Sequence, residues 1–127
     1  MAQVAPWAIV VTLTIHRVDP KNGRPMDSER ICQGMRYLLA RLNKGCFGHG
    51  HKRHGHRVGS HYVIERGTFG DHPHVHLTLT VPPHMPRADF EALLHDLVRR
   101  NSVFRPQYQI GPYTSAGLSH RHHKRGY

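Results

Sequence analysis

A stretch of strict alternation near the middle of the chain constrains its fold more than any other feature. From His74 to Val81 the sequence reads HVHLTLTV, with an apolar residue at every second position. Successive side chains of a β-strand point to opposite faces, so the histidines and threonines share one face while the valines and leucines share the other. We therefore expect a strand with one face in the core and one polar face.

Apolar periodicity predicts the other elements. In chain order we expect a strand at 7–15, a helix from Asp27 or Ser28 to about Asn43, strands at 61–66 and 74–81, a helix over 90–98 and a strand at 108–114. Gly45 is expected to end the first helix, and Lys44–Gly59 to form a loop. The segment 67–73 is expected to join its two strands as an antiparallel hairpin. Leu118–Tyr127 is either a further helix or a basic tail.

The resulting order, β-α-β-β-α-β, predicts an α+β fold of the ferredoxin-like or RRM-like kind. Such a fold has an antiparallel sheet with both helices on one face, and the other face stays open for an active site. The 127 residues fit one domain, residues 1–127.

The charge of the chain points to its partner. Its formal net charge is +10 with the histidines neutral, which suits a polyanion, most often a nucleic acid. The longest apolar stretch is too short to span a bilayer, and Met1–Val4 lacks the basic start of a signal peptide. Cys32 and Cys46 form neither a metal-type pair nor a disulfide framework. We expect a reduced, cytoplasmic protein without a membrane partner.

Three side chains predict a metal site on the polar face. Glu65 precedes His74 by nine residues, so the hairpin would bring it close to His74 across the strand pair. Together with His76 it would form a two-histidine, one-carboxylate set, which accepts Mn²⁺, Mg²⁺ or Zn²⁺. An open side would remain for substrate oxygens, as in a Lewis-acid site. The alternative is a pair of solvated histidines on a polar strand face.

Glu65, the motif His74-Val75-His76 and the segment TLTI at 12–15 resemble the HUH endonuclease superfamily, and the resemblance runs from Val10 to Tyr127. It implies metal-dependent nicking and joining of single-stranded DNA through a 5′-phosphotyrosine and a free 3′-OH, as in rolling-circle replication of a plasmid or virus. It also implies Mn²⁺ or Mg²⁺ as cofactor, with Zn²⁺ an alternative. The expected partner is single-stranded DNA or a DNA hairpin at an origin. A monomer is favoured, in the cytoplasm or, for a viral protein, inside the host cell.

The resemblance implies a tyrosine nucleophile after the last strand. Tyr127 is the first candidate and Tyr113 the second, while Tyr37 and Tyr62 are assigned to the core. Replication initiators carry a lysine a few residues after this tyrosine. The sequence has none after Tyr127, which leaves the choice between the two candidates open.

Two basic segments are candidates for binding DNA phosphates, because flexible cations suit a repeating polyanion. Their cations are Lys52, Arg53, Arg57, Arg121, Lys124 and Arg125. Solvated loops are the alternative for both segments. His16 and Arg17 are placed at the border of the metal site. The aromatic residues Trp7, Phe47 and Phe69 are candidates for stacking on unpaired bases.

Three other functions stay open. A single-tyrosine transposase of the same superfamily fits the same motif but works as a dimer. A two-histidine phosphoesterase would use His76-Leu77-Thr78 as one His-x-Thr motif, but the chain lacks a second. A non-catalytic module for single-stranded nucleic acid would need exposed aromatic residues on the sheet face, where we expect histidines and threonines.

Overall fold

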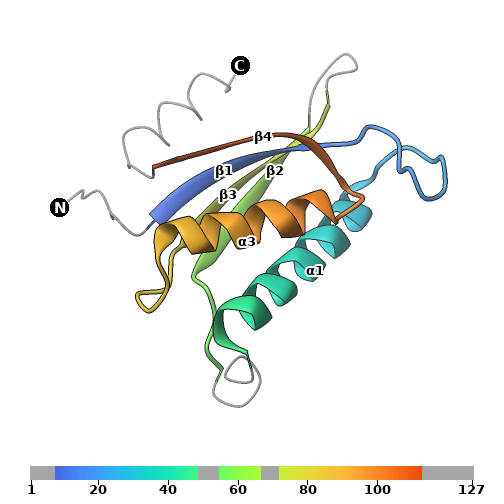
Figure 1. Cartoon of the computed structure of the whole chain (residues 1–127). Coiled ribbons are helices and arrows are strands. Elements are labelled where there is room, and N and C mark those ends of the chain that lie inside the picture. The colour runs from blue at the N-terminus through green and yellow to red at the C-terminus, as the bar shows by residue number, and fades with distance from the viewer. Residues whose placement is uncertain (1–7, 49–54, 67–71, 113–127) are drawn as a thin grey trace.

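The described part of the chain folds into one four-stranded sheet and two helices (Figure 1). The computed structural model describes residues 8–48, 55–66 and 72–112. In chain order its elements are β1 (Ala8–Ile15), α1 (Ser28–Phe47), β2 (Ser60–Glu65), β3 (His74–Thr80), α3 (Arg87–Arg99) and β4 (Phe104–Pro112). The expected α+β class is confirmed, and the described strands and helices follow one another in the expected sequence.

The sheet is antiparallel throughout, in the order β2-β3-β1-β4, so β3 and β1 are its central strands. Both helices lie on the same side of it (Figure 1). Alternate residues of the two central strands are completely buried beneath the helices; they are Ile9, Val11, Leu13, Ile15, Val75, Leu77 and Leu79. The alternation expected of β3 is confirmed.

Helix α1 begins as the sequence predicts and ends later. The Asp27 side chain caps it by accepting a hydrogen bond from the backbone N–H of Arg30 at 2.7 Å. The helix runs past Gly45 to Phe47 and ends at Gly48, whose φ of 55° favours glycine. The prediction of an end near Asn43 is therefore wrong.

The reason for Gly45 is packing between the helices. A Cβ at this position would lie 2.7 Å from Cδ2 of Leu93 on α3, closer than side chains approach one another. Glycine permits this close approach within α1.

No helix in the described ranges is long and apolar enough to cross a membrane.

Strand β4 begins at Phe104, four residues before the expected start at Tyr108. Pro106 disfavours the prediction of a strand in this segment, since proline cannot donate a ladder hydrogen bond. An edge strand tolerates proline, and within the described residues β4 lies at the edge of the sheet and pairs with β1. The first half of the strand was missed because its edge position is a property of the tertiary fold.

We predict that Asn43→Ala lowers the free energy of unfolding by about 1–3 kcal/mol. Asn43 is buried on α1, and its Oδ1 accepts a 2.6 Å hydrogen bond from the backbone N–H of Val58, which leads into β2. The substitution leaves a buried N–H without its acceptor. Urea denaturation measures the change, and Lys44→Ala at the next, exposed position is the control. Equal stability of the two variants would contradict this role of Asn43.

Candidate functional site

The candidate site lies on the face of the sheet that the helices leave uncovered. Strand register aligns its residues in two rows: His74 stands between Glu65 of β2 and Thr14 of β1, and His76 stands between Val63 and Thr12. Side chains of directly opposed residues lie on the same face. The predicted juxtaposition of Glu65 and His74 across the strand pair is confirmed.

The closest polar contact in these rows is diagonal. Nε2 of His76 lies 3.0 Å from Oε1 of Glu65. A carboxylate accepts and does not donate, so the proton of this hydrogen bond is on His76. The His76 side chain is only 7% exposed and that of Glu65 25% exposed, so the hydrogen bond is partly shielded from water. The alternative of a solvated histidine pair does not hold for His76.

The residue types and the register fit a divalent cation, because two imidazoles and a carboxylate stand on neighbouring positions of two paired strands. The side-chain arrangement does not yet close such a site. Within the described part of the chain, no three His, Cys, Asp or Glu side chains are grouped so as to hold a metal ion. A cation bound by His76 through Nε2 would replace the proton shared with Glu65. His74 is the direct cross-strand neighbour of Glu65 and would supply the second imidazole.

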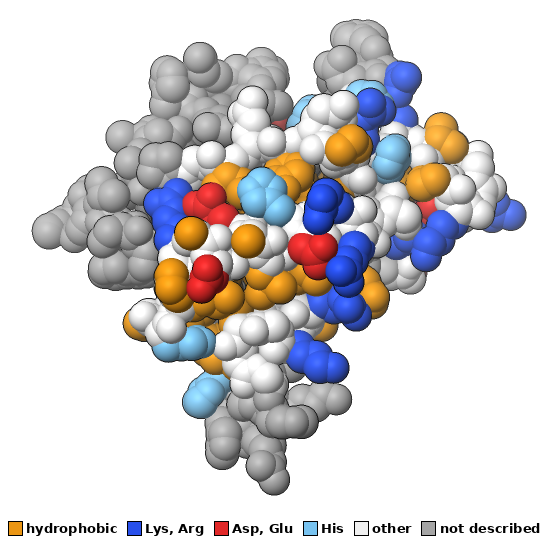
Figure 2. Space-filling model, in the orientation of Figure 1, with side chains coloured by type: hydrophobic (Ala, Val, Ile, Leu, Met, Phe, Trp, Pro, Cys, Tyr) orange, Lys and Arg blue, Asp and Glu red, His pale blue; other side chains and the backbone are white. Residues whose placement is uncertain are grey.

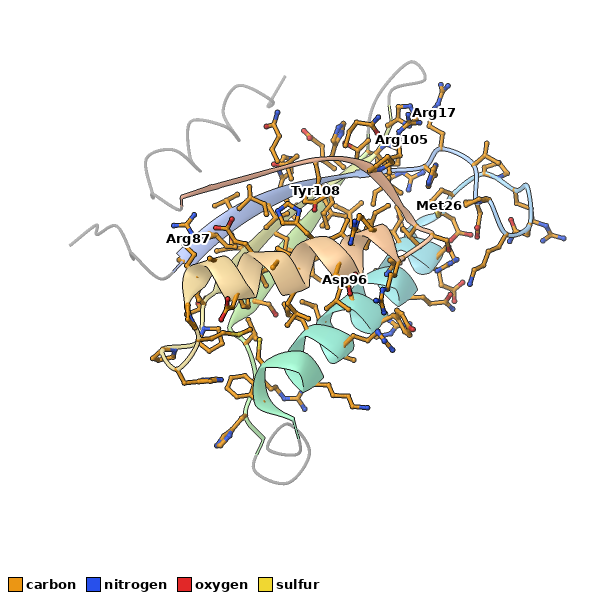
Figure 3. The ribbon with its side chains drawn as sticks, in the orientation of Figure 1. Arg17, Met26, Arg87, Asp96, Arg105 and Tyr108 are labelled. Carbon is orange, nitrogen blue, oxygen red and sulfur yellow. The ribbon has the colours of Figure 1, made fainter. Side chains whose placement is uncertain are left out.

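A second group of side chains lies at the end of the sheet where β3 begins. Nδ1 of His72 donates to the backbone carbonyl of Ile15 at 3.2 Å, because a carbonyl can only accept. This leaves Nε2 of His72 to accept from Nη1 of Arg105, 3.5 Å away. Arg105 and Arg17 lie at the same end of the molecule (Figure 3).

Arg105 and Thr12 are two neighbours of the site that the sequence reasoning did not single out. Arg105 precedes Tyr108, where the last strand was expected to begin, although it belongs to β4 in the structure. Thr12 belongs to the segment TLTI at 12–15, but its position beside His76 depends on the β1–β3 register. The alternation of residues in β1 indicates which face of the sheet Thr12 occupies. Its neighbour across the strands depends on the pairing of β1 with β3, two segments far apart in the sequence.

The two candidate nucleophiles, Tyr113 and Tyr127, lie outside the described residues. Tyr62 and Tyr108 pack against the core on the helix side of the sheet. Burial raises the pKa of Tyr62, and a hydrogen bond with Cys32 raises it further. Both effects disfavour the phenolate, so Tyr62 is a poor nucleophile.

The other two described tyrosines, Tyr108 and Tyr37, each contact a neighbouring side chain. The Tyr108 hydroxyl contacts Nδ1 of His95 on α3, and burial raises the pKa of Tyr108. The assignment of Tyr37 to the core is wrong, because this side chain is 55% exposed on α1. The guanidinium carbon of Arg41 lies 5.3 Å from the centre of its ring.

Of the six cations predicted to bind DNA, the structure describes Arg57, which is exposed in the segment before β2. The other five lie outside the described residues; they are Lys52, Arg53, Arg121, Lys124 and Arg125. His16 and Arg17 follow β1 directly, where the backbone N–H of Ile15 donates to the carbonyl of Pro73 at 2.9 Å. They therefore border the start of β3, as expected.

Of the three candidate stacking residues, the structure describes Phe47. Trp7 and Phe69 lie outside the described residues. Phe47 is at the end of α1, with its ring centre 5.7 Å from that of His56 and 5.3 Å from that of His84. This cluster belongs to the helix layer, so Phe47 is not part of the site at Glu65 and His76.

Comparison with known proteins adds no relative: no protein-family model matches the sequence, and no curated protein matches it.

We predict that His74→Ala weakens Mn²⁺ binding at least about tenfold, the scale on which even outer partners of metal ligands act. Isothermal titration of the full chain measures the affinity. His61→Ala is the control, because His61 is an exposed histidine on the same face, opposite Thr78, one row beyond His76. Equal Mn²⁺ affinity in the two variants would exclude His74 as a ligand.

Proposed function

We propose that this protein is a metal-dependent endonuclease that nicks and rejoins single-stranded DNA through a covalent tyrosine intermediate. The observation that carries the proposal is the placement of Glu65, His74 and His76 on one face of two paired strands, with a 3.0 Å contact between His76 and Glu65. The resemblance of these residues to the HUH superfamily supplies the reaction.

In this proposal Glu65, His74 and His76 hold Mn²⁺ or Mg²⁺, with Zn²⁺ as the alternative. A bound divalent ion polarises a phosphodiester oxygen and so favours attack at phosphorus. The hydrogen bond between Glu65 and His76 orients both side chains before any ion binds.

The nucleophile of the proposal is the hydroxyl of Tyr127, with Tyr113 as second candidate. Its oxygen forms a bond to phosphorus, and the bond from phosphorus to the 3′ oxygen breaks. The strand leaves as a free 3′-OH, which takes up one proton, and the 5′ phosphate stays on the tyrosine. Attack by a 3′-OH on the phosphotyrosine reverses the step without an external energy source.

The charge distribution supports a nucleic-acid substrate. Net charge is +10, and Arg17 and Arg105 lie at the end of the sheet where His74 begins β3. Stacking modules carry aromatic side chains on the open sheet face. In the described part of that face, the two central rows carry Thr, His, Val, Glu and Gln side chains and no Phe, Tyr or Trp ring, which supports a catalytic role over passive stacking.

The finer classification remains part of this proposal. We assign the sheet to the ferredoxin-like or RRM-like group on the order of its elements and on the position of both helices on one side. Assignment to a monomeric rolling-circle initiator of a plasmid or virus, acting in the cytoplasm at a single-stranded or hairpin origin, rests on the resemblance.

We predict a covalent protein–DNA adduct when the full chain is mixed with Mn²⁺ and a pool of single-stranded and hairpin oligonucleotides. Glu65→Gln is expected to reduce the adduct by about two orders of magnitude or more, the usual effect of removing one catalytic group. His61→Ala is expected to retain it. Denaturing gel electrophoresis detects the adduct as a band of reduced mobility.

Tyr127→Phe and Tyr113→Phe separate the two nucleophile candidates, and loss of the adduct in Tyr127→Phe is expected. Absence of any adduct from a folded sample with an intact C-terminus would contradict the proposed reaction. An adduct of undiminished yield in Glu65→Gln would contradict the role of the metal set.

A further inference from the structure

A pocket of about 590 Å³ opens on the helix side of the molecule, behind the sheet face that carries Glu65 and His76. Its lining comes from the β1–α1 loop, the first half of α1 and the turn between α3 and β4; the residues are Lys21, Arg30, Gln33, Gly34, Tyr37, Arg100, Asn101 and Ser102. The volume is typical of small-molecule sites. None of these residues takes part in the proposed metal site.

The pocket is positively charged. Its described lining contains three cations, Lys21, Arg30 and Arg100, and no carboxylate. Figure 2 shows Lys and Arg side chains gathered over this end of the molecule, where α1 begins and α3 ends. The nearby carboxylates are already engaged: Asp19 pairs with Arg30, and Asp96 pairs with Arg99 and Arg100.

Arg30 is held in a fixed orientation. Its Nε donates to Oδ2 of the buried Asp19 at 3.0 Å, and its Nη2 donates to the Ser102 hydroxyl at 3.3 Å. The backbone N–H of Lys21 and the Arg30 guanidinium lower the pKa of Asp19, so the carboxylate stays ionised at neutral pH. Among the described residues, the hydrogen bonds of the Arg30 guanidinium use Nε and Nη2, which leaves Nη1 available to an anion. An arginine fixed in this way loses little side-chain entropy on binding a phosphate.

The wall beside Arg30 is also well ordered. The Asn101 side chain is buried, donates to the carbonyl of Gly34 at 3.1 Å and accepts from the backbone N–H of Val103 at 3.1 Å. A Cβ on Gly34 would lie 2.7 Å from Cγ2 of Val103, so α1 and the turn before β4 are in close contact here. The pocket is therefore preformed.

An aromatic ring stands at the rim. Arg30, Gln33, Gly34 and Tyr37 follow helical spacing, so they lie along one face of α1. Tyr37 is 55% exposed, which is unusual for a large apolar side chain on a helix that has a core to pack against. An exposed ring next to bound phosphate is the arrangement that stacks on an unpaired base.

We propose that this pocket binds one nucleotide unit, with its phosphate against Lys21, Arg30 and Arg100 and its base on Tyr37. The unit is either a free nucleoside monophosphate or part of a single strand, and the two share this chemistry. The site lies on the opposite side of the sheet from Glu65 and His76, so it would contribute affinity without taking part in bond cleavage. The inference stands independently of the proposed nuclease reaction.

The test measures binding of the full chain to a fluorescein-labelled oligothymidylate by fluorescence anisotropy, with EDTA present so that no metal-dependent step contributes. The pocket variant is Lys21→Gln with Arg100→Gln, both at exposed positions. The control is Lys44→Gln with Arg87→Gln, which removes the same charge. Arg87 lies at the opposite end of α3 (Figure 3), and its ion pair with Glu91 matches that of Arg100 with Asp96.

We expect the pocket variant to bind at least about tenfold more weakly than the control variant, since it loses two charge-assisted phosphate contacts. Equal affinity of the two variants, both shown to be folded by thermal melting, would overturn the proposal. Competition by dTMP would assign the site to a free nucleotide. If the two variants differ as expected and dTMP does not compete, the site belongs to a single strand.

The role of Tyr37 has its own test. Tyr37→Ala is expected to weaken binding of the oligothymidylate about fivefold or more and to leave binding of an abasic strand unchanged, because an abasic strand has nothing to stack. Tyr37→Phe keeps the ring and should keep the affinity. Equal losses for both strands in Tyr37→Ala would overturn the assignment of the base to this ring.

Discussion

The burial of one face of β3 is the constraint on which the rest of the structure depends. Val75, Leu77 and Leu79 are completely buried, and each such side chain contributes about 1.5–3 kcal/mol relative to an exposed position. A slip of one residue would move all three to the opposite face and place His74 and His76 in the core. Hydrophobic burial therefore fixes the register, and the register places the candidate ligands beside Glu65.

This constraint separates the molecule into two sides with different tasks. The helix side contains the core and, at one end, the basic pocket around Arg30 and Tyr37. The other side contains the histidines and the carboxylate, with His76 largely shielded from water. Alternate side chains of a strand point to opposite faces of the sheet. When helices cover one face only, the same strand can contribute side chains to the core and to a site on the open face. The proposed cleavage and the proposed nucleotide site can therefore change independently.

Much of this arrangement could be predicted from the sequence, because it depends on local patterns. Period-two alternation identified the buried face of β3, and the length of the hairpin placed Glu65 opposite His74. What could not be predicted depends on tertiary contacts. Gly45 is typical of a helix end, but in the structure it packs against Leu93. Pro106 is typical of a strand breaker, but it lies on an edge strand. The basic pocket is lined by three segments that are separate in the sequence, so no local sequence pattern predicts it.

The proposed function depends on one metal site, formed by Glu65, His74 and His76 on the open face of the sheet. Its most direct test is the anomalous difference density of crystals of the full chain grown with Mn²⁺. We expect a single strong Mn²⁺ peak within coordination distance of the Glu65 carboxylate and of both imidazoles. Manganese bound elsewhere on the chain, with no peak at these three side chains, would contradict it.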